Sequence, residues 1–169
     1  MSESKPLSGK HIVVTGATAG IGLYSLLALV RAGAAVVGVG RSAERCRAAE
    51  AFVRSEVPGA QVEYLLADLS LQSQVHSLAR QIEAWLEHRH AALDVLVNNA
   101  GVYSQRLTRT ADGIELTLAV NHLAVFLLTH DLLPLLHAAP HGRVLTVSSN
   151  SHYRARLNPA GLNRPWLYV

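Results

Sequence analysis

Short apolar runs alternate with segments of helical periodicity along this chain, and that alternation limits the folds it can adopt. Five runs rich in Val, Leu and Ile each fit one strand, at residues 11–15, 35–39, 61–66, 93–97 and 143–147. Helical segments separate them, at residues 21–31, 42–55, 70–87 and 113–137, with Ser70 as an expected N-cap and an expected interruption near Pro134. Strands joined by helical crossovers form a parallel sheet with helices on both faces. We therefore predict an α/β fold, with one domain over residues 1–169.

Composition narrows the class of protein further. Half of the residues are hydrophobic, which suits a parallel sheet buried on both faces. The net charge of +3 comes from scattered arginines, so nucleic acid is not an expected partner. Cys46 is the one cysteine and the amino terminus lacks an apolar signal, so we expect a cytoplasmic protein. The apolar stretch 116–136 contains Asn, His, Asp and Pro residues, which predicts a buried helix and no membrane span.

A glycine-rich turn, TGATAGIG at residues 15–22, follows the first predicted strand and opens the first predicted helix. Glycines let the backbone turn tightly and approach a ligand closely. The start of a helix presents free N–H groups and the positive end of its dipole to a phosphate. The pattern predicts a pyrophosphate site, and the alternative is a tight turn with no ligand.

The end of the second predicted strand carries Gly40 and then Arg41. In dinucleotide-binding domains this place normally holds an acidic residue that binds the ribose 2′-hydroxyl. A guanidinium instead attracts a 2′-phosphate and donates paired hydrogen bonds to it. Arg41 therefore predicts NADP(H) as the preferred cofactor, with NAD(H) as the second choice. The alternative is an ordinary solvated arginine.

Five motifs occur in one order along the chain, and together they resemble the short-chain dehydrogenase/reductase family. They are TGATAGIG at 15–22, DLS at 68–70, NNAG at 98–101, Asn121 within AVNHL, and VSS ending at Ser149. The resemblance covers His11 to Ser149 and implies a Rossmann-type sheet with the strand order 3-2-1-4-5. The piece VNHLAVFLLTHDLLP at 120–134 is similar to the retinol-dehydrogenase-like branch.

The resemblance implies a role for each matching residue. The implied cofactor-binding residues are Thr15, Gly16, Thr18, Ala19, Gly20, Ile21, Gly22, Arg41, Asp68, Leu69, Asn98, Ala100 and Gly101. Residues 68–69 would border the adenine, although a strand end and a helix cap would look the same. Residues 98–101 would line the adenine ribose, although Asn and Gly also favour turns. Asn121 would hold a water in a proton relay, and Ser149 would hydrogen-bond the substrate oxygen.

The chain departs from the family at the expected Tyr–Lys pair, YxxxK, which would follow the fifth strand. Its two lysines are Lys5 and Lys10, and Tyr153 is followed four residues later by Leu157. We expect a truncated piece of a longer enzyme, without the C-terminal strands of the family. The alternative is a natural short form. In a truncated sheet the fifth strand would be an exposed apolar edge, which proteins normally protect.

These features predict an NADP(H)-dependent oxidoreductase that transfers hydride between nicotinamide and a small carbonyl or alcohol substrate. This chain alone would bind cofactor without turnover. The alternative is a non-catalytic NADPH-binding sensor, which would have no use for Asn121 and Ser149. The nine histidines are scattered and form no HExxH motif, so no metal site is predicted. A homo-oligomer is compatible with the sequence.

Overall fold

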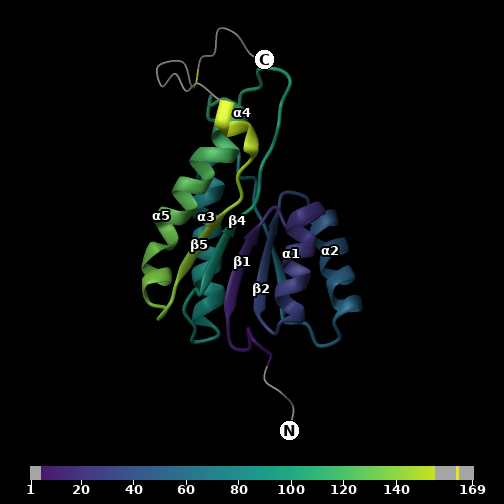
Figure 1. The fold of residues 1–169 in the computed structure, drawn as a ribbon. Helices are drawn as coiled ribbons and strands as arrows, with labels where there is room; N and C mark the ends of the chain where they lie inside the picture. Colours follow the sequence, from purple (N-terminus) through teal and green to yellow (C-terminus); the bar gives the residue numbers. More distant parts are fainter. Residues whose placement is uncertain (1–4, 155–162, 164–169) are drawn as a thin grey trace.

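Five parallel strands form the centre of the molecule, in the order β3-β2-β1-β4-β5 (Figure 1). The structure is a computed structural model that describes residues 5–154 and residue 163, so Leu157 lies outside the described part. The strands are β1 His11–Thr15, β2 Ala35–Gly40, β3 Val62–Leu66, β4 Val95–Asn98 and β5 Arg143–Thr146. The predicted doubly wound sheet and its strand order are confirmed.

Two helical layers cover the sheet. Helices α1 (Gly20–Arg31) and α2 (Ala43–Glu56) pack on one face, where they bury one apolar cluster. Helices α3 (Gln72–Glu87) and α5 (Ala124–His137) pack on the opposite face over a second cluster (Figure 1). All six residues of β2 are buried, because this strand lies between neighbours and beneath both layers. That double burial accounts for its continuous apolar sequence.

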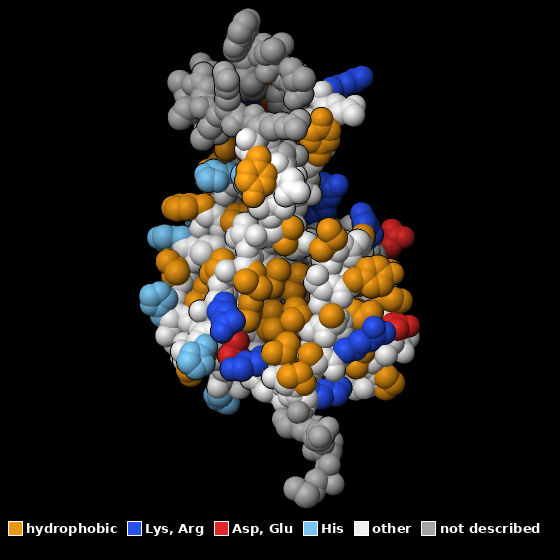
Figure 2. Space-filling view, viewed as in Figure 1, with side chains coloured by type: hydrophobic (Ala, Val, Ile, Leu, Met, Phe, Trp, Pro, Cys, Tyr) orange, Lys and Arg blue, Asp and Glu red, His pale blue; other side chains and the backbone are white. Residues whose placement is uncertain are grey.

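Strand β5 lies at the edge of the sheet and is exposed along its whole length. Leu145 is 53% exposed and Val147 is 51% exposed. Leu145 pairs with Val97 of β4, so the two side chains share the face that carries α1. Figure 2 shows hydrophobic side chains gathered in the middle of this face, between α5 and α1. The predicted exposed apolar edge is therefore present in the described residues.

The predicted helix 113–137 is interrupted at a different place from the one expected. It consists of α4 (Leu116–Leu118), a π-helical turn over Ala119–Leu123, and α5. Pro134 lies inside α5 without ending it, and its carbonyl still accepts from the N–H of Ala138. Pro134 lacks an N–H donor yet leaves α5 continuous, whereas the π turn changes the hydrogen-bond spacing locally, over Ala119–Leu123.

Two other boundaries differ from the predictions because distant residues set them. Helix α3 begins at Gln72 and Ser70 is not its cap, because the carboxylate of Asp112 accepts from the Gln72 N–H at 2.8 Å. Strand β4 begins at Val95, because Asp94 before it binds Lys10 and His11 at the start of β1. The carboxylate of Asp94 accepts from the Lys10 ammonium at 2.8 Å and from the backbone N–H of His11 at 2.9 Å.

The segment 116–137 is long and apolar enough to cross a membrane, judged by length and composition. Within the fold, α5 packs against α3 and the sheet. It buries Ala124, Leu128, Leu132 and Leu136, which repeat every four residues along one face. The segment thus packs on the core through one face, although only 28% of its apolar window is buried, so the predicted buried helix is present in part.

Candidate functional site

A cleft opens at the carboxyl ends of β1, β2, β3 and β4, with a cavity volume of about 370 Å³. Ligands of open parallel sheets bind at this edge, where the strand order reverses. Ten predicted cofactor-binding residues line it: Gly16, Thr18, Ala19, Ile21, Gly22, Arg41, Asp68, Leu69, Ala100 and Gly101. Segments far apart in the sequence therefore meet around one cavity.

The turn between β1 and α1 forms one wall of this cleft. A Cβ added at Gly22 would lie 2.3 Å from the carbonyl oxygen of Gly16, so only glycine allows α1 to start this close to the turn. Helix α1 begins at Gly20 with an extended N-cap residue, Ala19, that makes no side-chain cap. Its first turn holds no acidic residue. The exposed helix start offers N–H groups and a positive dipole end to an anion.

Hydrogen bonds join this turn to the end of β4. The hydroxyl of Thr15 accepts from the backbone N–H groups of Asn99 and Ala100, each at 3.0 Å. The Asn99 side-chain amide donates back to the carbonyls of Thr15 at 2.9 Å and Gly16 at 3.3 Å. Thr15 is only 2% exposed and lies outside the lining. It joins the glycine-rich turn to the end of β4 from beneath the lining residues.

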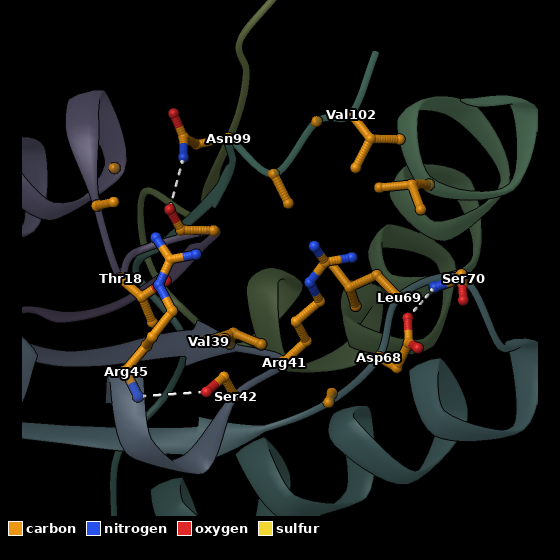
Figure 3. Close-up of a pocket in the computed structure, with 18 of the residues that line it drawn as sticks. Thr18, Val39, Arg41, Ser42, Arg45, Asp68, Leu69, Ser70, Asn99 and Val102 are labelled. Carbon is orange, nitrogen blue, oxygen red and sulfur yellow. Dashed lines mark hydrogen bonds between the residues drawn. The ribbon is translucent and has the colours of Figure 1, made fainter. Parts of the chain in front are cut away.

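The end of β2 and the start of α2 form a basic corner. Arg41 and Arg45 are both exposed, and their side chains rise from this corner into the pocket (Figure 3). Ser42 lies between them in sequence and caps α2, because its hydroxyl accepts from the Arg45 N–H at 3.4 Å. Asp68 is the one carboxylate among the lining residues, and it accepts from the Ser70 N–H at 2.9 Å. The corner therefore carries two positive charges opposite one negative charge.

Asn98 does not lie where the sequence predicted. It is 2% exposed, and its side-chain amide donates to the Thr129 hydroxyl of α5 at 3.0 Å. The neighbouring Asn99 lines the cleft instead. Successive residues of a strand point to opposite sides, so only one of the two asparagines can face the cavity. Gly20 also lies outside the lining residues, at the exposed start of α1.

The two predicted catalytic residues lie outside the residues that line the cleft. The Asn121 amide is part of the π-helical turn, where it accepts from the Val102 N–H at 2.8 Å and donates to the Val102 carbonyl at 2.9 Å. Val102 itself lines the cleft, so Asn121 fixes a wall of it. Ser149 follows β5 and is exposed, and its carbonyl accepts from the His152 N–H at 3.2 Å.

Sequence reasoning missed several lining residues, chiefly Ser42 and Arg45, whereas Asn99 lies within the range 98–101 that the resemblance placed in the site. A signal for Arg45 was present, because it follows Arg41 by four residues at the start of a predicted helix. Val102, Leu116 and Val120 add an apolar wall to which the sequence analysis assigned no role, although Val120 lies within the AVNHL motif. Among the described residues, no group of three or more His, Cys, Asp or Glu side chains could hold a metal ion.

A doubly wound parallel sheet with a glycine-rich, uncapped helix start at its carboxyl edge defines a Rossmann-type nucleotide-binding domain. The sequence profile of the short chain dehydrogenase family matches residues 10–158. The chain belongs to this family.

Relatives and solved structures agree with that assignment. The chain is 42% identical over 159 residues to human dehydrogenase/reductase SDR family member 13, covering 94% of this chain and 41% of the relative. It is 34% identical to human retinol dehydrogenase 13, covering 93% and 46% respectively. The predicted resemblance to the retinol-dehydrogenase-like branch is thus confirmed.

Among solved structures, a metagenomic short-chain oxidoreductase in complex with NADP superposes with a TM-score of 0.71 at 35% identity. The match covers 85% of this chain and 63% of that one. A short chain dehydrogenase from Shigella flexneri complexed with NADP gives a TM-score of 0.76 at 28% identity, over 92% and 65%. The chain thus spans about half or less of the curated relatives described above, and about two thirds of these solved chains.

Proposed function

We propose that this chain holds NADP(H) in the cleft, within an oxidoreductase that transfers hydride between the nicotinamide and a carbonyl or alcohol. The observation that carries the proposal is the basic corner of Arg41, Ser42 and Arg45. Arg41 stands where an NAD-binding domain would place a carboxylate for the ribose hydroxyls, and Arg45 of α2 adds a second guanidinium to the same corner. Positive charge at this point favours a 2′-phosphate, and NAD(H) remains the weaker ligand.

The remainder of the cleft suits the rest of a dinucleotide. The uncapped start of α1, over Ala19–Gly22, is suited to a pyrophosphate. Asp68 and Leu69 at the end of β3 would border the adenine, with the Asp68 carboxylate as an acceptor for its amino group. Ala100 and Gly101 would lie against the adenine ribose. Two related solved structures support the same cofactor, since one is a complex with NADP and the other with NADPH.

When bound, the nicotinamide supplies or accepts the hydride, and the protein supplies orientation and proton transfer. Asn121 and Ser149 are the proposed catalytic residues of this chain. Ser149 would hydrogen-bond the substrate oxygen. Asn121 would contribute to a proton relay from the π-helical turn, where its amide already binds Val102. These two hydrogen bonds fix the π-helical turn, so a relay water would find its hydrogen-bonding partners in fixed positions.

The Tyr–Lys pair that the family resemblance implies cannot come from these 169 residues, whose lysines are Lys5 and Lys10. We therefore propose that they form a cofactor-binding piece of a longer enzyme and bind without turnover. We likewise propose a carbonyl or alcohol as the substrate of the whole protein and the nicotinamide dinucleotide as its partner. We propose that the chain forms a single domain and that the protein resides in the cytoplasm. A homo-oligomer is compatible with this proposal.

The test is a fluorescence titration of the full chain with NADPH and with NADH. We expect tighter binding of NADPH. Arg41→Ala and Arg45→Ala should each weaken NADPH binding by about tenfold, the value of one charge-assisted hydrogen bond partly screened by water, and leave NADH unchanged. Arg47→Ala is the matched control, because Arg47 is exposed on the same helix but lies outside the lining. Equal binding of both dinucleotides by the wild type would refute the proposal.

A further inference from the structure

Tyr64 of β3 reaches across the neighbouring strand to the cofactor-binding turn. Its hydroxyl donates to the carbonyl oxygen of Ala17 at 2.8 Å, although the two residues are 47 positions apart in sequence. Tyr64 lies opposite Gly38 of β2 in the parallel register, so both residues face the layer of α1 and α2. The tyrosine ring therefore crosses β2 to reach a loop that follows β1.

Gly38 makes this crossing feasible. A Cβ added there would lie 2.5 Å from the ring of Tyr64, which is closer than real Cβ atoms approach. Any side chain at position 38 would push the ring away from its place over β2. Position 38 must be glycine only because the Tyr64 ring occupies the space above it. Gly38 is therefore linked to the hydrogen bond between Tyr64 and the turn.

The peptide groups on both sides of Ala17 are held. Its N–H donates to the carbonyl of Val39 at 3.1 Å, and its carbonyl accepts from Tyr64. Ala17 is fully buried, while its neighbours Gly16 and Thr18 line the cleft. A shift of Ala17 would therefore move the two residues that a bound dinucleotide would meet.

Tyr64 is suited to serve as a permanent donor. Burial raises the pKa of its hydroxyl far above the ordinary value, and the nearby Cys46 and Glu50 raise this pKa further. The hydroxyl therefore stays protonated throughout the physiological range. A phenylalanine at this position would fill the same space over Gly38 and lack only the donor.

We propose that Tyr64 is a positioning residue that fixes the turn of Thr15–Gly22 in the shape that binds the pyrophosphate of the dinucleotide. This inference rests on the proposed function, because it assigns Tyr64 to that same site. It predicts that loss of the hydroxyl weakens ligands whose pyrophosphate binds the turn and spares ligands that lack a pyrophosphate.

The test compares two ligands and two variants of the full chain. NADPH carries a pyrophosphate, whereas 2′-AMP offers only the adenosine and the 2′-phosphate. In Tyr64→Phe, we expect the Kd of NADPH to rise about fivefold, the effect of one net hydrogen bond, and the Kd of 2′-AMP to stay unchanged. Tyr24→Phe is the matched control, because Tyr24 is 62% exposed on α1. It should change neither Kd.

Gly38→Ala provides a second variant that keeps the hydroxyl but displaces the ring, and it should weaken NADPH selectively as well. An unchanged Kd of NADPH in Tyr64→Phe would overturn the inference. Equal weakening of both ligands would also overturn it, because the effect would then be a general loss of structure.

Hydrogen exchange of the ligand-free protein separates this inference from the proposed function. In Tyr64→Phe, the amides of residues 15–22 should exchange faster than in the wild type, because the turn has lost one anchor. If the wild type bound neither ligand, the proposed function would be refuted, and with it the cofactor role of Tyr64. Unchanged exchange at residues 15–22 would show in addition that Tyr64 does not hold the turn.

Discussion

Replacing Gly22 with alanine tests how tightly the cofactor-binding turn is packed. The added methyl would lie 2.3 Å from the Gly16 carbonyl oxygen and 2.4 Å from the side-chain nitrogen of Asn99. Ordinary contact begins at 3.4 Å, so α1 and the turn would have to separate by about 1.1 Å. The Gly16 atoms belong to the backbone, which cannot rotate out of the way.

The magnitude follows from two opposing effects. Overpacking of this kind costs about 1–3 kcal/mol. Alanine in place of glycine returns up to about 1 kcal/mol through its higher helix propensity. We therefore expect Gly22→Ala to lower the free energy of unfolding by about 1–2 kcal/mol. We also expect it to weaken NADPH binding at least about tenfold, because the helix start moves away from the turn.

Urea denaturation followed by circular dichroism measures the stability, and fluorescence titration measures the binding. Gly101→Ala is the matched control, because a Cβ there would meet its nearest neighbour, the Asn121 oxygen, at 3.6 Å, an ordinary contact. Its stability should stay within about 0.5 kcal/mol of the wild type. If Gly22→Ala were as stable as Gly101→Ala and bound NADPH like the wild type, the packing argument would be wrong.

Three further changes test the core, the helix pair and the wall of the cleft. Leu132→Ala should cost about 2–5 kcal/mol in urea denaturation because Leu132 is fully buried, whereas Leu133→Ala, at a 40% exposed position, should cost far less. Burial raises the pKa of Asp131, but hydrogen bonds from one histidine of α3 and one of α5 outweigh this and lower it overall. Its stabilisation is therefore present above the unfolded pKa of 3.8 and is lost as the pH falls through the folded value. Asp131→Asn should be less stable than wild type at pH 7, and unfolding curves at decreasing pH should converge below 3.8; a constant gap would contradict this reading. Asn121→Ala removes both hydrogen bonds to the Val102 backbone, so the amide of Val102 should exchange faster, and an unchanged rate would show that the loop is held by other contacts.

Local sequence patterns predicted the sheet and most of the cleft because those features depend on neighbouring residues. The five apolar runs and the helices between them indicated a parallel sheet, and the family resemblance implied its strand order. The glycine spacing at residues 15–22 and the arginine after Gly40 placed two walls of the site.

Distant contacts decided the features that the sequence did not predict. Helix α3 starts at Gln72 because Asp112, forty residues later, binds its first N–H. Asn98 turns away from the cleft because Thr129 of α5 offers it a partner. Both contacts depend on how the layers pack, and no local pattern indicates them.

The π-helical turn at Ala119–Leu123 has a consequence for how this segment tolerates changes in length. A π turn holds one residue more than an α-helical turn, and each residue of an α-helix adds about 100° of rotation. The turn thus sets the phase between Leu116, which lines the cleft, and the stripe of α5 that packs on the sheet. Deleting a single residue here would restore α-helical spacing and leave both the wall at Leu116 and that stripe close to their present orientation, because the π turn already absorbs the extra residue within one turn. The segment therefore tolerates the loss of one residue as long as Asn121 keeps its two hydrogen bonds to Val102.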